Sequence, residues 1–299
     1  MKILITGANG FIGRHLTARL SARHEVYAVV RSAPESSPGD GISAIVANLA
    51  RPLDIRVLPA HTDAVVHLAQ ANVPFPEAAD ELFSVNTSTT QQLLNYARLA
   101  GAKVFLLASS GDVYGTRLGL CKETDALVPA DFYALTKYAS ELLTDAYKDY
   151  FQSHVLRLFK PYGPGQANRL IPRLAERISQ GKAIRLNTDD HPHMTPIYID
   201  DVLTAFERAI DASYSGAINI AGDEIVTFRE LAEAIGLAVG VKPEFEQTEE
   251  QTGDMMGDNG WMKQILGRWP LVELAEGLER TLATTEPTKN KLRATSGNE

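Results

Sequence analysis

Short apolar runs alternate with longer helical patterns through the first half of the chain. Apolar runs bounded by turn residues are typical of buried strands, and apolar positions three and four residues apart are typical of helices that cover a sheet. The predicted strands are residues 3–6, 26–30, 44–47, 64–68, 104–108 and 154–159. The predicted helices are residues 11–20, 85–100 and 133–150. Strands that alternate with helices indicate βαβ units, so we expect an α/β fold with a doubly wound parallel sheet.

The pattern changes after Pro161. Helices are predicted for residues 170–180, 200–212 and 227–236, short strands for 184–186 and 217–220, and loops for 32–41 and 246–260. Thr227 is a plausible N-cap of the third helix. We therefore expect a first domain at 1–160, a smaller substrate-binding lobe at 161–283 with segments that return to the first domain, and a loose tail at 284–299.

Composition narrows the class of protein. The 299 residues carry a formal net charge of −8 and 44% hydrophobic residues, which is typical of a globular protein and argues against nucleic-acid binding. The one cysteine, Cys121, cannot form an internal disulfide, and we expect it to be inert in a reducing compartment. Met1 and Lys2 lead directly into the first strand, and no apolar run approaches the length of a membrane span. We expect a cytoplasmic protein with no membrane partner.

Three glycines spaced three apart connect the first predicted strand to the first helix. Gly7 would allow a tight turn, Gly10 would let the backbone approach a pyrophosphate, and Gly13 would let helix and strand pack closely. The helix N-terminus would then face a phosphate. The spacing is G-x-x-G-x-x-G instead of G-x-G-x-x-G. Alone it fits either a dinucleotide cradle or an ordinary strand-to-helix turn.

Tyr133 and Lys137 would lie on one face of the predicted helix 133–150. A free tyrosine has a pKa of about 10, and a neighbouring ammonium group would lower this pKa. Tyr133 could then exchange a proton with a reacting oxygen during hydride transfer. A serine of segment 108–115, at the carboxyl edge of the sheet, could hydrogen-bond that oxygen. The alternatives are a surface Tyr/Lys pair and an ordinary turn.

Together these segments resemble the extended short-chain dehydrogenase/reductases, the NAD(P)-dependent nucleotide-sugar epimerase/dehydratase family. The resemblance runs from Met1 to about Ala283. The matching segments are TGANGFIG at 6–13, VVHLA at 65–69, Asn86, SSGDVYG at 109–115, YALTK at 133–137, RLFKPYGPGQ at 157–166, PIYIDDV at 196–202, NIAGDE at 219–224 and LGRWPLVELAEGL at 266–278. The resemblance implies a Rossmann-type fold, hydride transfer on a nucleotide sugar or keto sugar, and a homodimer.

The resemblance also implies a role for each matching position. Tyr133 would be the acid/base, Lys137 would lower its pKa and bind the nicotinamide ribose, and Ser110 would orient the substrate oxygen. The cofactor would contact Gly7, Gly10, Phe11, Ile12, Gly13, Arg31, Ser32, Asn48, Leu49, Leu68, Ala69, Gln70 and Phe159. Asn86 would support the fold beside the cofactor.

One departure from the family pattern concerns the cofactor. NAD-binding members usually end the second strand with an Asp that binds the adenosine ribose, and Val30 stands there, followed by Arg31. A missing carboxylate and an added guanidinium favour a 2′-phosphate, so we expect NADP(H). The alternative is that Arg31 stacks on adenine and NAD(H) binds.

Other departures concern the substrate. Lys160 replaces an Asn that contacts the substrate diphosphate, and Met194 replaces an Arg that grips it, which leaves a nucleotide-diphosphate substrate in question. Arginines that could substitute are Arg169, Arg173 and Arg185. Asp112 stands where dehydratases carry a catalytic Glu, although SSGDVYG is also similar to the segment of GDP-4-keto-6-deoxymannose reductases.

Several alternatives therefore stay open. Epimerisation, reduction and dehydration through Asp112 all fit, as does a non-catalytic nucleotide-sensing protein. His191 and His193 resemble a metal pair, but no third ligand is evident and we expect a polar loop without metal. The helices predicted at 85–100 and 133–150 are apolar over more of their surface than one sheet face requires, which favours a dimer interface or burial under the substrate lobe.

Overall fold

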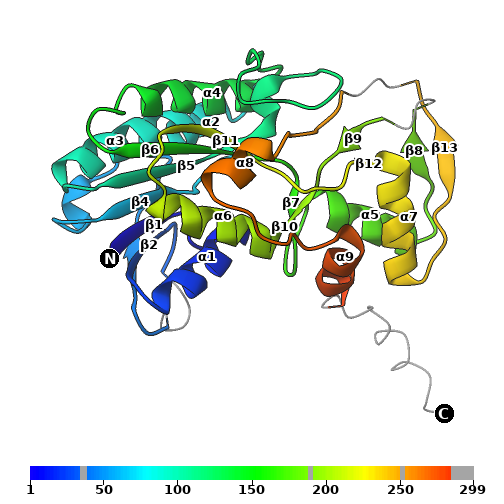
Figure 1. The fold of residues 1–299 in the computed structure, drawn as a ribbon, viewed down its shortest axis with the longest axis horizontal. Coiled ribbons are helices and arrows are strands. Elements are labelled where there is room, and N and C mark those ends of the chain that lie inside the picture. The colour runs from blue at the N-terminus through cyan, green and yellow to red at the C-terminus, as the bar shows by residue number, and fades with distance from the viewer. Residues whose placement is uncertain (34–38, 188–190, 250–252, 284–299) are drawn as a thin grey trace, which may run out of the picture.

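The computed structural model describes residues 1–33, 39–187, 191–249 and 253–283. Within these residues, seven parallel strands form one sheet in the order β11-β6-β5-β4-β1-β2-β3 (Figure 1). The strands are β1 (Lys2–Thr6), β2 (Glu25–Val30), β3 (Ile42–Val46), β4 (Ala64–His67), β5 (Val104–Ser110), β6 (Gln152–Leu158) and β11 (Gly216–Ile220). The strand order reverses between β1 and β4, which is where doubly wound folds bind dinucleotides. The predicted α/β fold is confirmed.

Helices cover both faces of the sheet. Helices α1 (Phe11–Ser21) and α6 (Ile199–Asp211) lie on one face, and α2 (Ala79–Phe83), α3 (Thr89–Leu99) and α4 (Phe132–Asp145) lie on the other (Figure 1). All four residues of β4 are buried, because helices exclude water from both faces of a parallel sheet. Two segments after Pro161, α6 and β11, join this layered unit. The domain boundaries at 160 and 283 stay a prediction.

Two helices differ from the predicted ones. The helix predicted for residues 85–100 already begins at Ala79 and contains a π-helical turn at Ser84–Ser88. Asn86 therefore lies inside a helix and does not open one. The helix predicted to reach residue 150 ends at Asp145. The apolar pattern continues past that end because Tyr147 stacks on Phe151, with ring centroids 6.1 Å apart, in the turn that leads to β6.

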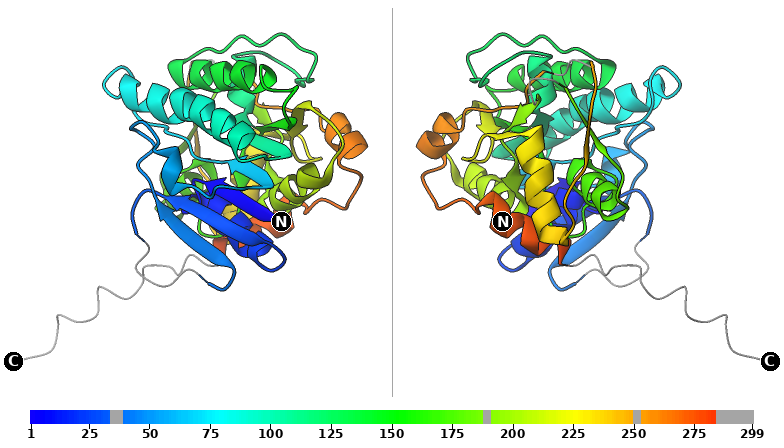
Figure 2. Two further views of the ribbon diagram at one scale, coloured as in Figure 1. Left: turned by 90° about the vertical axis from the view of Figure 1, so that its left-hand side faces the viewer. Right: turned by 90° about the vertical axis from the view of Figure 1, so that its right-hand side faces the viewer.

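A smaller lobe stands beside the carboxyl edge of the sheet. It contains α5 (Leu170–Ser179), α7 (Phe228–Val239), α9 (Leu274–Leu282) and the short strands β8 (Ile184–Leu186) and β13 (Phe245–Gln247). In the right-hand view of Figure 2, α7 (yellow) faces the viewer on this lobe. Thr227 caps α7 through a capping box with Glu230, as its position predicted.

The loop prediction for residues 246–260 is wrong at both ends. Residues 246 and 247 belong to β13, which pairs in parallel with β8, and Gly260 begins α8 (Gly260–Ile265). A strand of three residues is too short to produce a period-2 signal, so its pairing decides the structure. Part of the predicted loop 32–41 and the predicted tail 284–299 lie outside the described residues.

His154 on β6 is expected to make the protein acid-labile. Its side chain is fully buried, and neither ring nitrogen has a hydrogen-bond partner among the described residues. Burial lowers the pKa of His154 from 6.5 to about 4. Protonation therefore favours the unfolded chain, so stability present above pH 6.5 is lost as the pH falls through about 4. The full loss is about 3 kcal/mol, at about 1.4 kcal/mol for each pH unit between the two values.

The test is urea unfolding between pH 7 and about pH 4. The His154→Leu variant should lose less unfolding free energy over this interval than the wild type, whereas the control His61→Leu, at a side chain that is 61% exposed, should match the wild type. Equal acid losses in wild type and His154→Leu would show that His154 is not responsible.

Candidate active site

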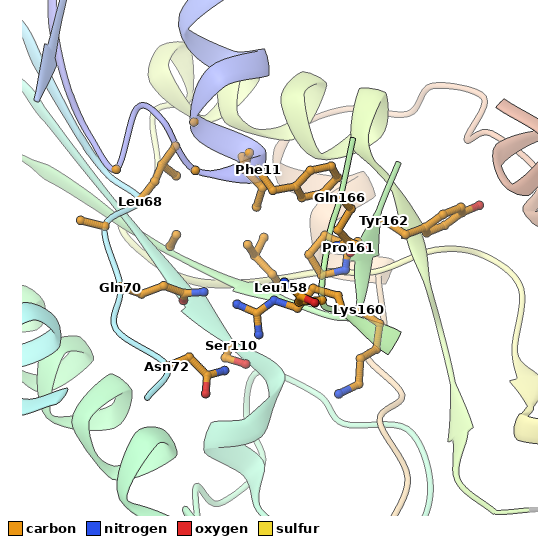
Figure 3. A pocket seen from close by; sticks show the side chains of 18 of the residues that line it. Phe11, Leu68, Gln70, Asn72, Ser110, Leu158, Lys160, Pro161, Tyr162 and Gln166 are labelled. Atoms are coloured by element: carbon orange, nitrogen blue, oxygen red, sulfur yellow. Dashed lines mark hydrogen bonds between the residues drawn. The ribbon is translucent and has the colours of Figure 1, made fainter. Parts of the chain in front are cut away.

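A cavity of about 840 Å³ lies between the carboxyl edge of the sheet and the smaller lobe (Figure 3). We call it the central cavity. Its lining from the sheet half includes Gly7, Gly10, Phe11, Ile12, Gly13, Arg31, Asn48, Leu49, Leu68, Ala69, Gln70, Ser110, Asp112 and Tyr133. Its lining from the second half of the chain includes Lys160, Arg169, Arg173, Arg177, Met194 and Met255. The cavity therefore joins most of the predicted site residues in one space.

The glycine turn between β1 and α1 has little room for side chains. Gly7 has φ +70°, and a Cβ there would lie 2.7 Å from the backbone nitrogen of Ala69. A Cβ on Gly13 would lie 2.0 Å from the carbonyl oxygen of Gly7. The first glycine thus permits the turn and the third permits close packing of α1, as their spacing predicted. The turn lies at the β1/β4 reversal, and the N-terminal end of α1 faces the central cavity.

Tyr133 lies in the first turn of α4. The helix begins there because the side chain of Asp131 accepts a hydrogen bond from the backbone nitrogen of Ala134, at 2.7 Å. The Tyr133 hydroxyl donates to Oε1 of Gln70, at 2.8 Å. Ser110 ends β5 in the same lining, and its hydroxyl donates to Oδ2 of Asp112, at 2.8 Å. A phenol, a hydroxyl and a carboxylate thus share one part of the cavity.

The pKa of Tyr133 is shifted in the direction opposite to the sequence expectation. Burial raises this pKa, the charge of Asp112 raises it further, and Arg169 and Ser110 only partly oppose them. Lys137 is fully buried outside the cavity lining, and its Nζ donates to the carbonyl oxygen of Ala108. Burial lowers the pKa of Lys137 to about 8, with Glu141 opposing. The raised pKa therefore keeps the Tyr133 phenol protonated at neutral pH.

Three predicted cofactor contacts, Ser32, Phe159 and Lys137, do not line the central cavity, and neither does Asn86. Ser32 is exposed beyond the end of β2. Phe159 is fully buried among Val113 and Tyr114, because its flanking residues 158 and 160 take the cavity side at the end of β6. Asn86 is also buried.

The side-chain amide of Asn86 forms hydrogen bonds with both the backbone N–H and the backbone carbonyl group of Ala71. Its Oδ1 accepts from the nitrogen of Ala71 at 2.8 Å, and its Nδ2 donates to the carbonyl oxygen of Ala71 and to the hydroxyl of Thr136. These bonds tie the segment that carries Gln70 to helix α4, which carries Tyr133. Asn86 thus positions the lining without contacting the cavity.

The central cavity is positively charged although the whole chain is acidic. Among its described lining residues, Asp112 is the one carboxylate, against the cations Arg31, Lys160, Arg169, Arg173 and Arg177. The last three are spaced four apart at α5 and so share one face of the helix. This spacing is visible in the sequence and also identifies Arg177, which was not among the predicted substrate contacts. Such a lining favours an anionic ligand.

Three other expectations are settled outside this cavity. Arg185 points elsewhere, because its Nε pairs with Oε1 of Glu246 at 2.9 Å. Cys121 is buried, and burial raises the pKa of its thiol to about 11, which is consistent with an inert thiol. The expectation that His191 and His193 lack a third ligand is wrong, because Asp254 lies beside both.

In the part of the chain described, no helix has the length and apolar character needed to cross a membrane.

Comparison with known proteins gives consistent matches. The model of the NAD dependent epimerase/dehydratase family matches residues 3–221. A UDP-glucose 4-epimerase of Mycolicibacterium smegmatis is 31% identical, over 94% of this chain and 97% of that protein. A dTDP-4-dehydro-6-deoxy-D-allose reductase of Streptomyces bikiniensis is 29% identical, over 81% and 82% of the two chains. The structure of MoeE5 in complex with UDP-glucuronic acid and NAD superposes with a TM-score of 0.84, at 27% identity over 95% and 98%.

Proposed function

Because the chain belongs to the NAD-dependent epimerase/dehydratase family, we propose that it transfers hydride between a nicotinamide dinucleotide and a nucleotide sugar. One observation carries the proposal: a single cavity joins the glycine turn, the Ser110/Tyr133 pair and the arginine face of α5. The turn fits a dinucleotide pyrophosphate, and the arginines fit a second diphosphate. These arginines supply the positive charge that is lost where Met194 replaces the usual Arg.

Each reacting residue has a distinct part in the proposed chemistry. The bound dinucleotide supplies the hydride acceptor and donor. The Tyr133 hydroxyl, kept protonated by its raised pKa, gives its proton to a carbonyl oxygen during reduction and becomes a tyrosinate, and in the reverse direction this tyrosinate takes the hydroxyl proton of the substrate. Ser110 orients the reacting oxygen. Lys137, held under the carbonyl oxygen of Ala108, supports this edge of the site.

Two overall reactions share this hydride step. Epimerisation returns the hydride to the same carbon, and the matched UDP-glucose 4-epimerase favours it. Net reduction of a keto sugar is the second candidate, because Arg31 favours NADP(H) and a reductase is also among the relatives. Asp112, bonded to Ser110, suits orientation of that hydroxyl better than elimination chemistry.

The test has two stages. First, the nucleotide released from the denatured purified protein is identified by mass spectrometry. Second, turnover is measured with a panel of UDP-, dTDP- and GDP-sugars and their 4-keto forms. An epimerase interconverts 4-epimers without net use of cofactor, whereas a reductase consumes one NADPH for each product. Nucleotide-sugar binding with no turnover across the panel would contradict both reactions and favour a sensing protein.

Arg31 is expected to decide the choice of cofactor. It lines the central cavity beside Val30, and its guanidinium lies 3.7 Å from Glu81. A charge-assisted bond to a 2′-phosphate contributes about 1.5–3 kcal/mol, so Arg31→Ala should weaken NADPH binding by about tenfold or more. NADH binding should change little, as measured by fluorescence titration. The control is the exposed Arg51→Ala. Equal losses for the two cofactors, or tightly retained NAD in the wild type, would contradict an NADP(H) preference.

We also expect the chain to form a homodimer through α3 and α4. Large apolar side chains stay exposed on and beside these helices, including Leu99, Leu135 and Leu142, which are 57%, 48% and 56% exposed. These side chains are not buried under the substrate lobe, and their exposure supports packing against a partner subunit.

A further inference from the structure

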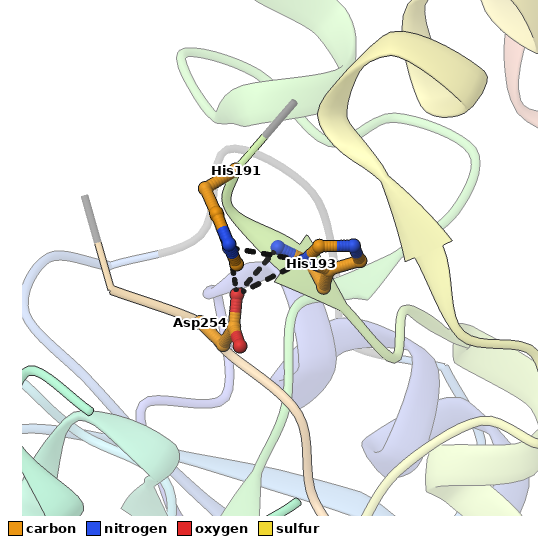
Figure 4. A group of neighbouring side chains, drawn as sticks. All are labelled: His191, His193 and Asp254. Carbon is orange, nitrogen blue, oxygen red and sulfur yellow. Dashed lines mark hydrogen bonds and ion pairs between the residues drawn. The ribbon is translucent and has the colours of Figure 1, made fainter. Parts of the chain in front are cut away.

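His191, His193 and Asp254 form a compact cluster outside the lining of the central cavity (Figure 4). The Nδ1 atom of His191 lies 2.7 Å from Oδ1 of Asp254, and the Nδ1 atom of His193 lies 3.3 Å from the same oxygen. The two Nδ1 atoms are 3.0 Å apart. We call these residues the His-His-Asp cluster. Three potential ligand atoms therefore converge on one point, although 61 residues separate His193 from Asp254.

The backbone holds the carboxylate of this cluster in place. Its Oδ1 also accepts from the backbone nitrogen of His193 at 2.8 Å, and its Oδ2 accepts from the backbone nitrogen of Gly119 at 2.9 Å. Asp254 is buried, whereas the His191 and His193 side chains are 22% and 29% exposed. A fixed carboxylate under two partly exposed imidazoles is a common arrangement in metal sites, where outer bonds orient each ligand.

Hydrogen bonding alone gives this cluster an imperfect arrangement. Two imidazole nitrogens face each other and one oxygen, and that oxygen already accepts a backbone N–H. If both Nδ1 atoms carry protons, their two N–H groups crowd each other. If one Nδ1 atom has no proton, its lone pair points toward a lone pair of the Asp254 carboxylate. A cation between the three atoms would satisfy all of their lone pairs.

We propose that His191, His193 and Asp254 bind one divalent transition-metal ion of the zinc type. Zinc takes imidazole nitrogen and carboxylate oxygen at about 2.0–2.2 Å, so two of its tetrahedral ligands lie roughly 3.3 Å apart. The three separations in the cluster are 2.7, 3.0 and 3.3 Å, so the shortest would have to expand by about 0.6 Å and the longest already fits. The exposed side of the imidazoles leaves a fourth position to water. Two imidazoles disfavour magnesium, which prefers oxygen ligands.

The ion would hold together part of the wall of the central cavity. His193 precedes Met194, and Asp254 precedes Met255, and both methionines line the cavity. The two segments are already bridged, because the nitrogen of Met255 donates to the carbonyl oxygen of His193 at 2.8 Å. Metal binding would add a second cross-link beside this bond. It would therefore stabilise the wall at the substrate end, whatever the reaction of the enzyme.

Titration of the tag-free, chelator-treated full chain with zinc chloride in a calorimeter tests the proposal. We expect one zinc per chain, a zinc-dependent rise in Tm, and no heat from magnesium chloride. His191→Ala and His193→Ala should each weaken zinc binding by about 100-fold or more, since even outer partners of metal ligands contribute 10- to 100-fold. Cobalt(II) should show the visible absorption of a tetrahedral site in the wild type and lose it in both variants.

The chain offers a matched control in His61. Its Nε2 lies 3.4 Å from Oδ1 of Asp63, which makes one imidazole–carboxylate pair without a second histidine. His61→Ala should bind zinc like the wild type. Absence of saturable zinc binding, or undiminished binding in the folded His191→Ala and His193→Ala variants, would overturn the proposal and leave a hydrogen-bonded clamp.

Discussion

Tyr133→Phe is expected to lower the turnover number by about 10²- to 10⁴-fold while cofactor affinity changes little. This range is the usual contribution of a general acid or base, and phenylalanine keeps the ring but cannot transfer a proton. The lost hydroxyl donates to Gln70 and lies in the same lining as Ser110, so the change is confined to the reacting end of the central cavity. Steady-state kinetics with the identified substrate, and a fluorescence titration with cofactor, measure the two quantities.

The control for this variant is Tyr138→Phe. Tyr138 lies on the same helix, outside the cavity lining, so removal of its hydroxyl should leave turnover near the wild-type value. The pH profile adds a second readout. Burial raises the pKa of Tyr133, so the rate of ketone reduction should hold through neutral pH and fall only in alkaline solution. Substantial turnover by Tyr133→Phe would assign proton transfer to another group.

Local patterns in the sequence predicted the sheet and the cofactor turn. Each strand of the first half is a short apolar run, and a helix pattern follows most of them, so the βαβ order requires little tertiary information. Gly7 and Gly13 could be assigned because backbone geometry dictates glycine at such a turn. The arginine spacing at 169 and 173 likewise contained the signal for Arg177.

The features that were missed depend on contacts between distant segments. Asp254 meets His191 only because the segment at 253–257 returns beside β9 (His193–Met194), and no local spacing indicates this. The direction of the Tyr133 pKa shift depends on its burial and on Asp112, which comes from another strand end. Phe159 faces away from the cavity because of strand alternation at the end of β6. Successive side chains of a strand point to opposite faces, so an assignment that is wrong by one residue exchanges a cavity position for a core position.

Arg157→Met is expected to lower the free energy of unfolding by about 3–5 kcal/mol. Arg157 on β6 and Glu141 on α4 form a buried ion pair, with side chains 6% and 7% exposed and Nη2 2.7 Å from Oε2. The arginine also donates to the hydroxyl of Tyr114, and Ser109 donates to the carboxylate. Removing one partner leaves an uncompensated buried charge, which costs more than the pair contributes. Urea unfolding at pH 7 measures the loss.

The double variant Arg157→Met/Glu141→Leu separates this cost from the value of the pair. Two apolar side chains leave no buried charge in the pair, so most of the lost stability should return. The turnover of the double variant should nevertheless stay below the wild-type value. The charge of the Glu141 carboxylate raises the pKa of Lys137, whereas burial lowers it. Removal of this carboxylate should therefore lower the Lys137 pKa further and neutralise the ammonium group near neutral pH. A stable double variant with wild-type turnover would show that the charge of Lys137 is not required, whereas a stable variant with reduced turnover would support a part for this charge in catalysis.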